Sequence, residues 1–172
     1  ITQIEKGKIT EDLAIDIVEL GNLEGVEDLI GGNRAEGVDL NYFLTRGLFV
    51  ASAYGYSQVV ELLVKNDAKV NMAYIEGKTP LHLAAEYGRS QVVKLLVKKE
   101  GIKINATNEA GYSPLHLVAI NGHVNIVELL VTNGAKVNKA DNYNYTPLHW
   151  AVKRGRLQVT KFLLEHEQIN VN

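Results

Sequence analysis

Apolar and polar positions recur along this chain with a period of about 33 residues, a spacing typical of short structural repeats. The clearest copies begin at Gly77, Gly111 and Asn144 and read GKTPLHLAAEYGRSQVVKLLVKKEGIKIN, GYSPLHLVAINGHVNIVELLVTNGAKVN and NYTPLHWAVKRGRLQVTKFLLEHEQINVN. Each copy holds an apolar stretch after Pro-Leu-His, then a glycine, then a second apolar run of the VVxLLV kind. The pattern predicts two antiparallel helices and a turn in every copy.

Residues suited to helix ends mark the boundaries of these predicted helices. A threonine or serine stands where an N-cap hydroxyl is needed, and a proline follows at the first helical position. A glycine then closes the first helix, at a position that favours positive φ. The caps are Thr79, Ser113 and Thr146, the prolines are Pro80, Pro114 and Pro147, and the glycines are Gly88, Gly122 and Gly155. All three prolines of the chain therefore serve one purpose.

Two weaker copies precede these three. The segment GLFVASAYGYSQVVELLVKNDAKVN, from Gly47, keeps the second apolar run but lacks the Thr-Pro-Leu-His start. Residues from Thr10 to Ile30 give a fainter copy, with Gly21 in register with Gly55. The sequence thus predicts five stacked helix pairs, which are most regular from residue 72 onward.

This pattern resembles the ankyrin repeat. The resemblance rests on TPLHLAA at 79–85, SPLHLVA at 113–119 and TPLHWAV at 146–152, and on Val-Asn or Ile-Asn endings at 70–71, 104–105, 137–138 and 171–172. It covers about residues 10–172. The resemblance implies an all-α ankyrin-repeat solenoid of stacked helix-turn-helix units, each with a β-hairpin finger that projects roughly perpendicular to the helices.

We expect residues 1–172 to form a single ankyrin repeat domain. Its expected parts are an atypical N-terminal capping unit at 10–41, a unit with a shortened finger at 42–71, and full repeats at 72–105, 106–138 and 139–172. The shortened finger is predicted because seven residues separate Asn41 from Leu48, against ten between Asn71 and Leu81.

Charge and apolar residues distinguish the two ends of the array. Residues 1–40 hold ten acidic and three basic residues, although the net charge of the whole chain is only −2. We interpret the acidic stretch as the solvated face of a terminal cap, with a specific acidic docking site as the alternative. The last helix pair keeps apolar residues such as Val159, Phe162 and Leu164, so we expect a parent array that continues past Asn172.

Composition narrows the class of protein further. Apolar residues make up 46% of the chain and charged residues 22%, which is typical of a folded domain. The absence of cysteine excludes disulfides and thiolate metal sites. No apolar run reaches about 18 residues, so no transmembrane helix is expected. The basic excess after residue 40 is too dilute to indicate nucleic acid as a partner.

The five histidines invite a metal hypothesis, which their spacing opposes. His82, His116 and His149 recur at one place in each repeat, so stacking separates them by about 8–10 Å. One zinc ion needs ligands at about 2.0–2.1 Å. We expect each imidazole to bond its capping hydroxyl and nearby backbone instead, and we expect His123 and His166 to face solvent. No metal, no cofactor and no catalytic residue is predicted, and the Ser113–His116 pair is assigned to the cap.

The residues that differ between repeats are the candidates for binding a partner. By the ankyrin resemblance, partners meet the finger tips and the exposed ends of the first helices. The expected contact residues are Tyr54, Ile75, Glu76, Lys78, Glu86, Tyr87, Glu109, Tyr112, Ile120, Asn121, Asn142, Tyr143, Tyr145, Trp150, Lys153 and Arg154. This set is rich in tyrosine, which is common at binding hot spots. For Tyr112 and Tyr145, the alternative is that they only cover the finger base.

The resulting functional prediction is a non-enzymatic protein–protein interaction module with a concave, tyrosine-rich surface. The alternative is the targeting or substrate-recognition part of a larger effector, toxin or enzyme. We expect a monomer, with association through the last repeat as an alternative, and a protein partner whose identity stays open. The expected location is the cytoplasm. Fifteen asparagines fit an AT-rich genome, for which delivery into a host cell is an alternative. Asn71, Asn105, Asn138 and Asn172 are expected to bond loop backbone between units, and the resemblance leaves their modification open.

Overall fold

The computed structural model describes residues 11–32 and 39–166. Within these ranges the chain forms ten α-helices and one short 3-10 helix. The helices are α1 (Glu11–Glu19), α2 (Leu23–Gly31), α3 (Leu40–Tyr54), α4 (Ser57–Lys65), η1 (Ile75–Gly77), α5 (Pro80–Glu86), α6 (Ser90–Leu96), α7 (Pro114–Asn121), α8 (Val124–Thr132), α9 (Pro147–Lys153) and α10 (Leu157–Glu165). The expectations for Thr10, Val171 and Asn172 lie outside the described residues.

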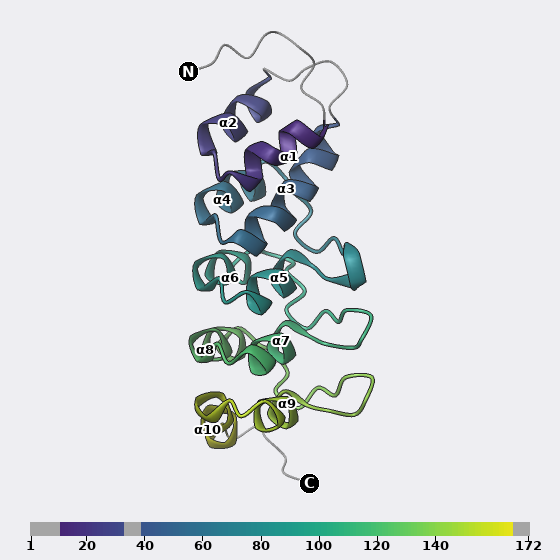
Figure 1. Cartoon of the computed structure of the whole chain (residues 1–172), viewed down its shortest axis with the longest axis vertical. Helices are drawn as coiled ribbons and strands as arrows, with labels where there is room; N and C mark the ends of the chain where they lie inside the picture. The colour runs from purple at the N-terminus through teal and green to yellow at the C-terminus, as the bar shows by residue number, and fades with distance from the viewer. Residues whose placement is uncertain (1–10, 33–38, 167–172) are drawn as a thin grey trace.

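The helices form antiparallel pairs that stack along one axis (Figure 1). The first helices of successive pairs pack on one another in the order α1, α3, α5, α7 and α9, and the second helices stack beside them in the order α2, α4, α6, α8 and α10. This is the all-α solenoid that the repeat pattern predicts. None of the described helices is long and apolar enough to cross a membrane.

The predicted caps are present at the starts of α5, α7 and α9. The prolines occupy the first helical positions, and the backbone N–H of His82 donates to Thr79 Oγ1 at 3.4 Å, as His149 does to Thr146. The predicted glycine adopts positive φ within two residues of the end of each of these helices, with values of 71° at Gly88, 87° at Gly122 and 65° at Gly155. The predicted caps are confirmed, and they are predictable from sequence because each acts within one turn of the chain.

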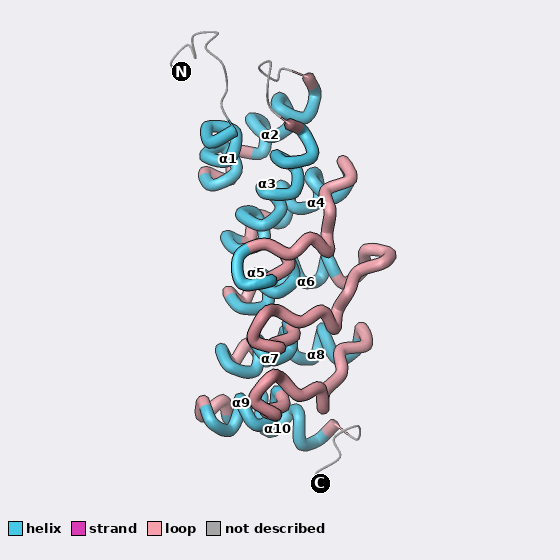
Figure 2. The backbone as a smooth tube through the Cα atoms, turned by 90° about the vertical axis from the view of Figure 1, so that its right-hand side faces the viewer, coloured by secondary structure: helices cyan, strands magenta, loops and turns pink. Residues whose placement is uncertain are grey.

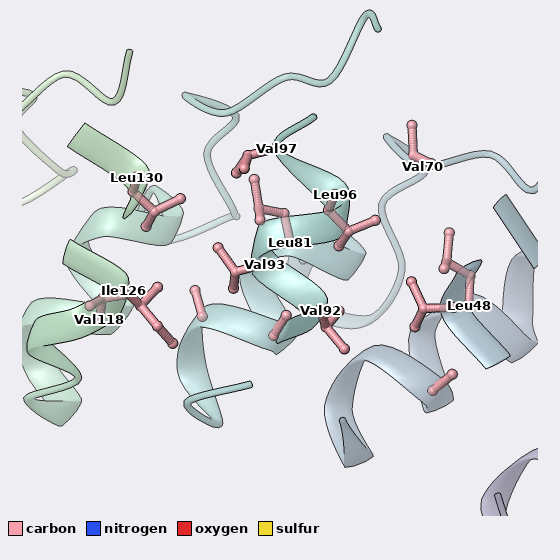
Figure 3. Packing of buried hydrophobic residues seen from close by; sticks show 14 of the residues in the cluster. Leu48, Val70, Leu81, Val92, Val93, Leu96, Val97, Val118, Ile126 and Leu130 are labelled. Carbon is pink, nitrogen blue, oxygen red and sulfur yellow. The ribbon is translucent and has the colours of Figure 1, made fainter. Parts of the chain in front are cut away.

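One apolar core runs through the stack (Figure 3). Leu81 and Val93 of one pair lie between Leu48 of the pair before it and Ile126 of the pair after it, and all four are buried. Small residues such as Ala85 are fully buried where first helices meet, which lets the helices approach closely. Each pair therefore completes its core only against its neighbours.

Three loops project from the first helices as fingers: residues 72–78, 106–112 and 139–145 (Figures 1 and 2). The β-hairpins expected here are not seen, because the described residues contain no strand. Each finger is closed by a pair of backbone bonds. One runs from a residue N–H to the carbonyl four residues later: Tyr74 to Lys78 at 2.9 Å, Asn108 to Tyr112 at 3.0 Å and Asp141 to Tyr145 at 2.9 Å. The other returns to the carbonyl of that first residue from the N–H three residues later: Gly77 to Tyr74 at 2.9 Å, Gly111 to Asn108 at 3.0 Å and Asn144 to Asp141 at 3.1 Å. So short a turn cannot form a ladder, and the fingers are turns.

The α3–α4 pair is built differently from the three pairs that follow. Helix α3 has 15 residues, whereas α5 and α9 have seven and α7 has eight. Its extra turns, residues 40–46, stand where the later pairs have a finger and a Thr-Pro or Ser-Pro cap. Asp39 caps this longer helix by accepting from Asn41 N–H at 2.9 Å.

Candidate protein-binding surface

Buried histidines connect each finger to the next. The Thr79 N–H donates to His82 Nδ1 at 3.1 Å, so Nδ1 is an acceptor and Nε2 carries the proton. Nε2 then donates to the Tyr112 carbonyl, in the following finger, at 3.0 Å. His116 repeats the arrangement with Ser113 and with the Tyr145 carbonyl at 3.1 Å. The predicted bond from ring to cap is confirmed, and the bond to the next finger is an addition that one repeat read alone does not reveal.

Burial sets the charge of these two rings. His82 and His116 have no exposed surface. Burial lowers the pKa of His82 to about 4 and also lowers the pKa of His116, although each ring bonds a carbonyl. Both rings are therefore neutral near pH 7, which the bond from Thr79 N–H to Nδ1 also requires. Among the described residues there is no group of three or more His, Asp or Glu side chains placed to hold a metal ion.

A second series of bonds links the helix pairs at the C-terminal ends of the first helices. The residue after each loop glycine donates to the end of the preceding first helix: Tyr56 Oη to Glu19 O at 2.9 Å, Arg89 Nε to Ala53 O at 2.8 Å, His123 Nε2 to Glu86 O at 3.1 Å and Arg156 Nε to Ile120 O at 2.9 Å. We call these four side chains the latch residues. The expectation that His123 faces solvent is wrong, because its ring packs against Gly88. The signal that was missed is a hydrogen-bonding side chain directly after glycine in four copies.

The recurring asparagines bridge successive loops as expected, where the structure shows their partners. Asn71 Nδ2 donates to Gly101 O at 2.8 Å, and its Oδ1 accepts from Lys103 N–H at 2.9 Å. Asn105 makes the same pair of bonds to Gly134 O and Lys136 N–H. These contacts fix the spacing between fingers and so shape the surface that the fingers form.

The most exposed of the predicted contact residues lie at finger tips and at first-helix ends. Tyr143 is 68% exposed and Ile75 is 69% exposed, both on fingers. Tyr54 and Tyr87, each 52% exposed, occupy equivalent places at the ends of α3 and α5. Solvent-exposed tyrosine rings therefore recur along one side of the stack.

Trp150 is one of the predicted contact residues, but its side chain is buried. It is only 8% exposed, and its Nε1 donates to Asp141 Oδ2 at 2.7 Å. Its ring lies 5.6 Å from the Tyr112 ring and 5.4 Å from the Tyr145 ring, measured between centroids. Tyr112 and Tyr145 are half-buried around it. The aligned Leu117 is also buried, and the apolar residue at this position in all three repeats is the sequence signal that could have placed Trp150 inside.

Asp141 organises the 139–145 finger from within. Its Oδ1 accepts from the backbone N–H groups of Tyr143 at 2.8 Å and Tyr145 at 3.0 Å. Burial opposes the charge of Asp141, but the bonds from Trp150 and from these two amides outweigh it and lower the pKa of the carboxyl. Asn108 does the same work in the 106–112 finger, where its Oδ1 accepts from Tyr112 N–H at 2.9 Å.

Charged side chains divide the surface into an acidic and a basic part. Lys78 Nζ lies 3.0 Å from Glu76 Oε2 and 2.9 Å from Glu86 Oε2. Burial works against the charge of Lys78, yet these carboxylates raise its pKa. At the other end, Lys153 Nζ lies 4.8 Å from the centroids of both Tyr145 and Trp150. Lys78 is thus already engaged by two carboxylates, while the exposed Lys153 continues the aromatic surface.

A hollow of about 470 Å³ lies between the 72–78 and 106–112 fingers and the end of α7. The remaining predicted contact residues line it or lie beside it: Glu109 and Asn142 on the fingers, and Ile120 and Asn121 at the end of α7. Asn142 Nδ2 donates to Glu109 O at 2.8 Å, and Asn121 Nδ2 to Leu117 O at 2.9 Å. Arg154, from α9's C-terminal end, reaches the same hollow, so three helix pairs contribute to one surface.

Stacked helix pairs, capped by Thr-Pro or Ser-Pro and joined by fingers, define an α-solenoid repeat protein. A family model described as ankyrin repeats in three copies matches residues 14–108 and again residues 101–172. The chain belongs to the ankyrin repeat family. A comparison with curated proteins finds no match to this chain. Ankyrin repeats are generally protein–protein interaction modules and are typically non-catalytic.

Proposed function

We propose that this chain is a non-enzymatic module that binds a partner protein along the finger tips and the ends of the first helices. The observation that carries the proposal is the set of open tyrosines, Tyr54, Tyr87 and Tyr143, on that one side of the stack. Tyrosine offers a large contact area at a small cost in side-chain entropy. The solvent-facing surface of the second helices carries mainly charged or amide side chains instead, such as the exposed Lys94, Glu128 and Gln158.

The residues of this surface take two roles in the proposal. Exposed side chains, including Ile75, Glu76, Tyr87, Glu109, Tyr143, Lys153 and Arg154, meet the partner. The buried Trp150 and the half-buried Tyr112 and Tyr145 support the surface from below. Removing Trp150 would therefore weaken binding indirectly, through the shape of the 139–145 finger.

Affinity capture from a lysate with two matched baits tests this proposal. One bait is the chain with Tyr87→Ala and Tyr143→Ala, and the other carries Lys94→Ala and Glu128→Ala on the second helices. We expect the same captured protein with the unchanged chain and with the Lys94/Glu128 bait, and its loss with the tyrosine bait. Loss with the Lys94/Glu128 bait alone would place the binding surface on the second helices and refute the proposal.

A further inference from the structure

A groove of about 320 Å³ lies between α3 and the 72–78 finger, at the place where the α3–α4 pair lacks a finger of its own. Its walls are mainly aromatic or apolar, and its rim is polar. The apolar lining comes from Tyr42, Phe49, Met72, Ala73 and Tyr74, and the polar lining from Asp39, Asn41, Thr45, Arg46 and Lys69. Met72 and Tyr74 are each about half exposed, so the groove is open to solvent.

The apolar floor follows from a substitution within the repeat. Phe49 aligns with His82 and His116, which reach the next finger through a hydrogen bond. Phe49 cannot do so, and its buried ring instead lies 5.4 Å from the Tyr74 ring of the next finger. A polar link is thus replaced by an aromatic contact with empty space beside it.

The 72–78 finger also has an unused backbone donor, on the residue that follows the groove-lining Tyr74. Each later finger donates one backbone bond to the finger before it: Glu109 N–H to Glu76 O at 3.0 Å, and Asn142 N–H to Ala110 O at 3.3 Å. The aligned donor of the 72–78 finger is the Ile75 N–H, and it has no partner among the described residues. An open donor at the end of a hydrogen-bonded row is a docking point for another extended chain.

We propose that this groove binds an extended segment of the partner protein, which takes the place of the missing finger. A backbone carbonyl of that segment accepts the Ile75 N–H, and a large apolar or aromatic side chain enters the groove over Phe49. The row of bonded fingers is thereby continued by one member. This inference rests on the proposed function and adds to it the site and the chemistry of one anchor.

The test uses a displayed library of random linear 12-residue peptides, selected on the whole chain. One selected peptide is synthesised, and its affinity is measured by titration against three variants. Tyr74→Ala removes a groove wall, and Ile75→Pro removes the amide donor at the first position of a helical turn, where proline is tolerated. Ile75→Ala keeps the donor and is the matched control. Melting temperatures show that the variants are folded, and Met72→Ser replaces Tyr74→Ala if that variant is not.

We expect selected peptides to carry a Phe, Tyr, Trp, Leu or Met that their binding requires. Tyr74→Ala should weaken binding about tenfold, as for an interface anchor. Ile75→Pro should weaken it about fivefold, as for one lost hydrogen bond. Ile75→Ala also removes the exposed side chain but keeps the donor, so it should weaken binding clearly less than Ile75→Pro, and the difference between the two variants measures the backbone bond.

Three outcomes would overturn the inference. Peptides whose binding depends on Tyr143 and Lys153 but not on Tyr74 would refute the groove and leave the proposed function intact. Equal loss with Ile75→Pro and Ile75→Ala would exclude the backbone bond. Binders that emerge only after residues 33–38 are replaced by Gly-Ser repeats would show that the chain's own segment occupies the groove.

Discussion

The α3–α4 pair and the α5–α6 pair occupy neighbouring places in one stack, yet they solve the same packing problem differently. The α5–α6 pair begins with a capping hydroxyl, a proline and a buried histidine, and it has a finger. The α3–α4 pair has none of these and has a longer first helix and a buried phenylalanine instead. The finger, the capping hydroxyl and the buried histidine therefore occur together or not at all in these two pairs.

The physical reason lies in the needs of the histidine. A buried imidazole is tolerated when its two nitrogens have partners, and His82 finds them in the Thr79 cap and the Tyr112 carbonyl. In α3 the equivalent residues are already inside a helix, so no free cap amide faces position 49. An apolar ring is the remaining way to fill the site, and Phe49 does so.

The largest expected effect is acid sensitivity that arises in the fingered pairs. Because the pKa of His82 is lowered from 6.5 to about 4, the folded state binds fewer protons than the unfolded state. Stability is therefore full above pH 6.5 and falls as pH drops from 6.5 towards 4, by about 3 kcal/mol for this one group. His116 shifts in the same direction. Urea unfolding at a series of pH values measures the loss.

His82→Gln is the matched variant for that experiment. Glutamine at this position can still bond back to the Thr79 backbone but does not titrate. The slope of stability between pH 6.5 and 4 should become shallower than in the unchanged chain. An unchanged slope would mean that the acid sensitivity comes from other groups.

The next effect concerns the inner support of a finger. Asp141→Ala leaves the Trp150 Nε1 and two finger amides without their acceptor, and it should cost about 2 kcal/mol of unfolding free energy. Asp141→Asn keeps an acceptor oxygen for the two finger amides, as Asn108 does in its finger, but turns its NH2 group towards the Trp150 N–H, so it should recover only part of the loss. Thermal or urea unfolding compares the two. Equal losses would show that the bonds to the two finger amides contribute little, and that the carboxylate acts mainly through its charge and its bond from Trp150.

The latch residues are shared by both kinds of pair, and their effect should be smaller. Arg89→Met keeps much of the aliphatic contact with Gly55 but removes the bond to Ala53 O at the end of α3. We expect a loss of about 1 kcal/mol, because the Ala53 carbonyl becomes accessible to water. Hydrogen exchange should report faster opening between α3 and α5. No change in exchange there would indicate that the bond contributes little to joining the pairs.

An effect of similar size but opposite sign is expected at Ser52, in α3. Its side-chain oxygen is fully buried and has no hydrogen-bond partner among the described residues, whereas the aligned Ala85 and Ala119 are apolar and equally buried. Ser52→Ala should stabilise the chain by about 1 kcal/mol, since an unsatisfied buried hydroxyl is costly. A rise in melting temperature checks this. A fall would mean that the hydroxyl has a partner after all.

The helix pairs could be predicted from the sequence because their signals are local. Pro80 fixes the start of α5, Gly88 fixes its end, and both act through the conformation of one or two residues. The stack followed from the repeat, since each apolar face needs a neighbour. The unit boundaries and the contact residues remain predictions.

Features that depend on contacts between repeats could not be predicted from the sequence of one repeat. The bond from His82 to Tyr112 spans 30 residues, and the latch of His123 on Glu86 spans 37. Trp150 looked like a surface anchor because it differs from its aligned leucines, but its position in the fold is interior. The spacing before Leu48 predicts a shortened finger in this unit, but the groove beside α3 also depends on the contact of Phe49 with Tyr74, which lies 25 residues away in the next finger.

The most direct test of the central claim is a titration of the captured partner against single variants of the whole chain. Tyr143 is the cleanest probe, because its ring is open to solvent and the bond of its backbone N–H to Asp141 survives truncation. Tyr143→Ala should weaken binding by about 2 kcal/mol, or roughly 30-fold, at unchanged melting temperature. Lys94→Ala, on α6, should cost less than about 0.5 kcal/mol. A larger loss with Lys94→Ala than with Tyr143→Ala would contradict a binding surface formed by fingers and first-helix ends.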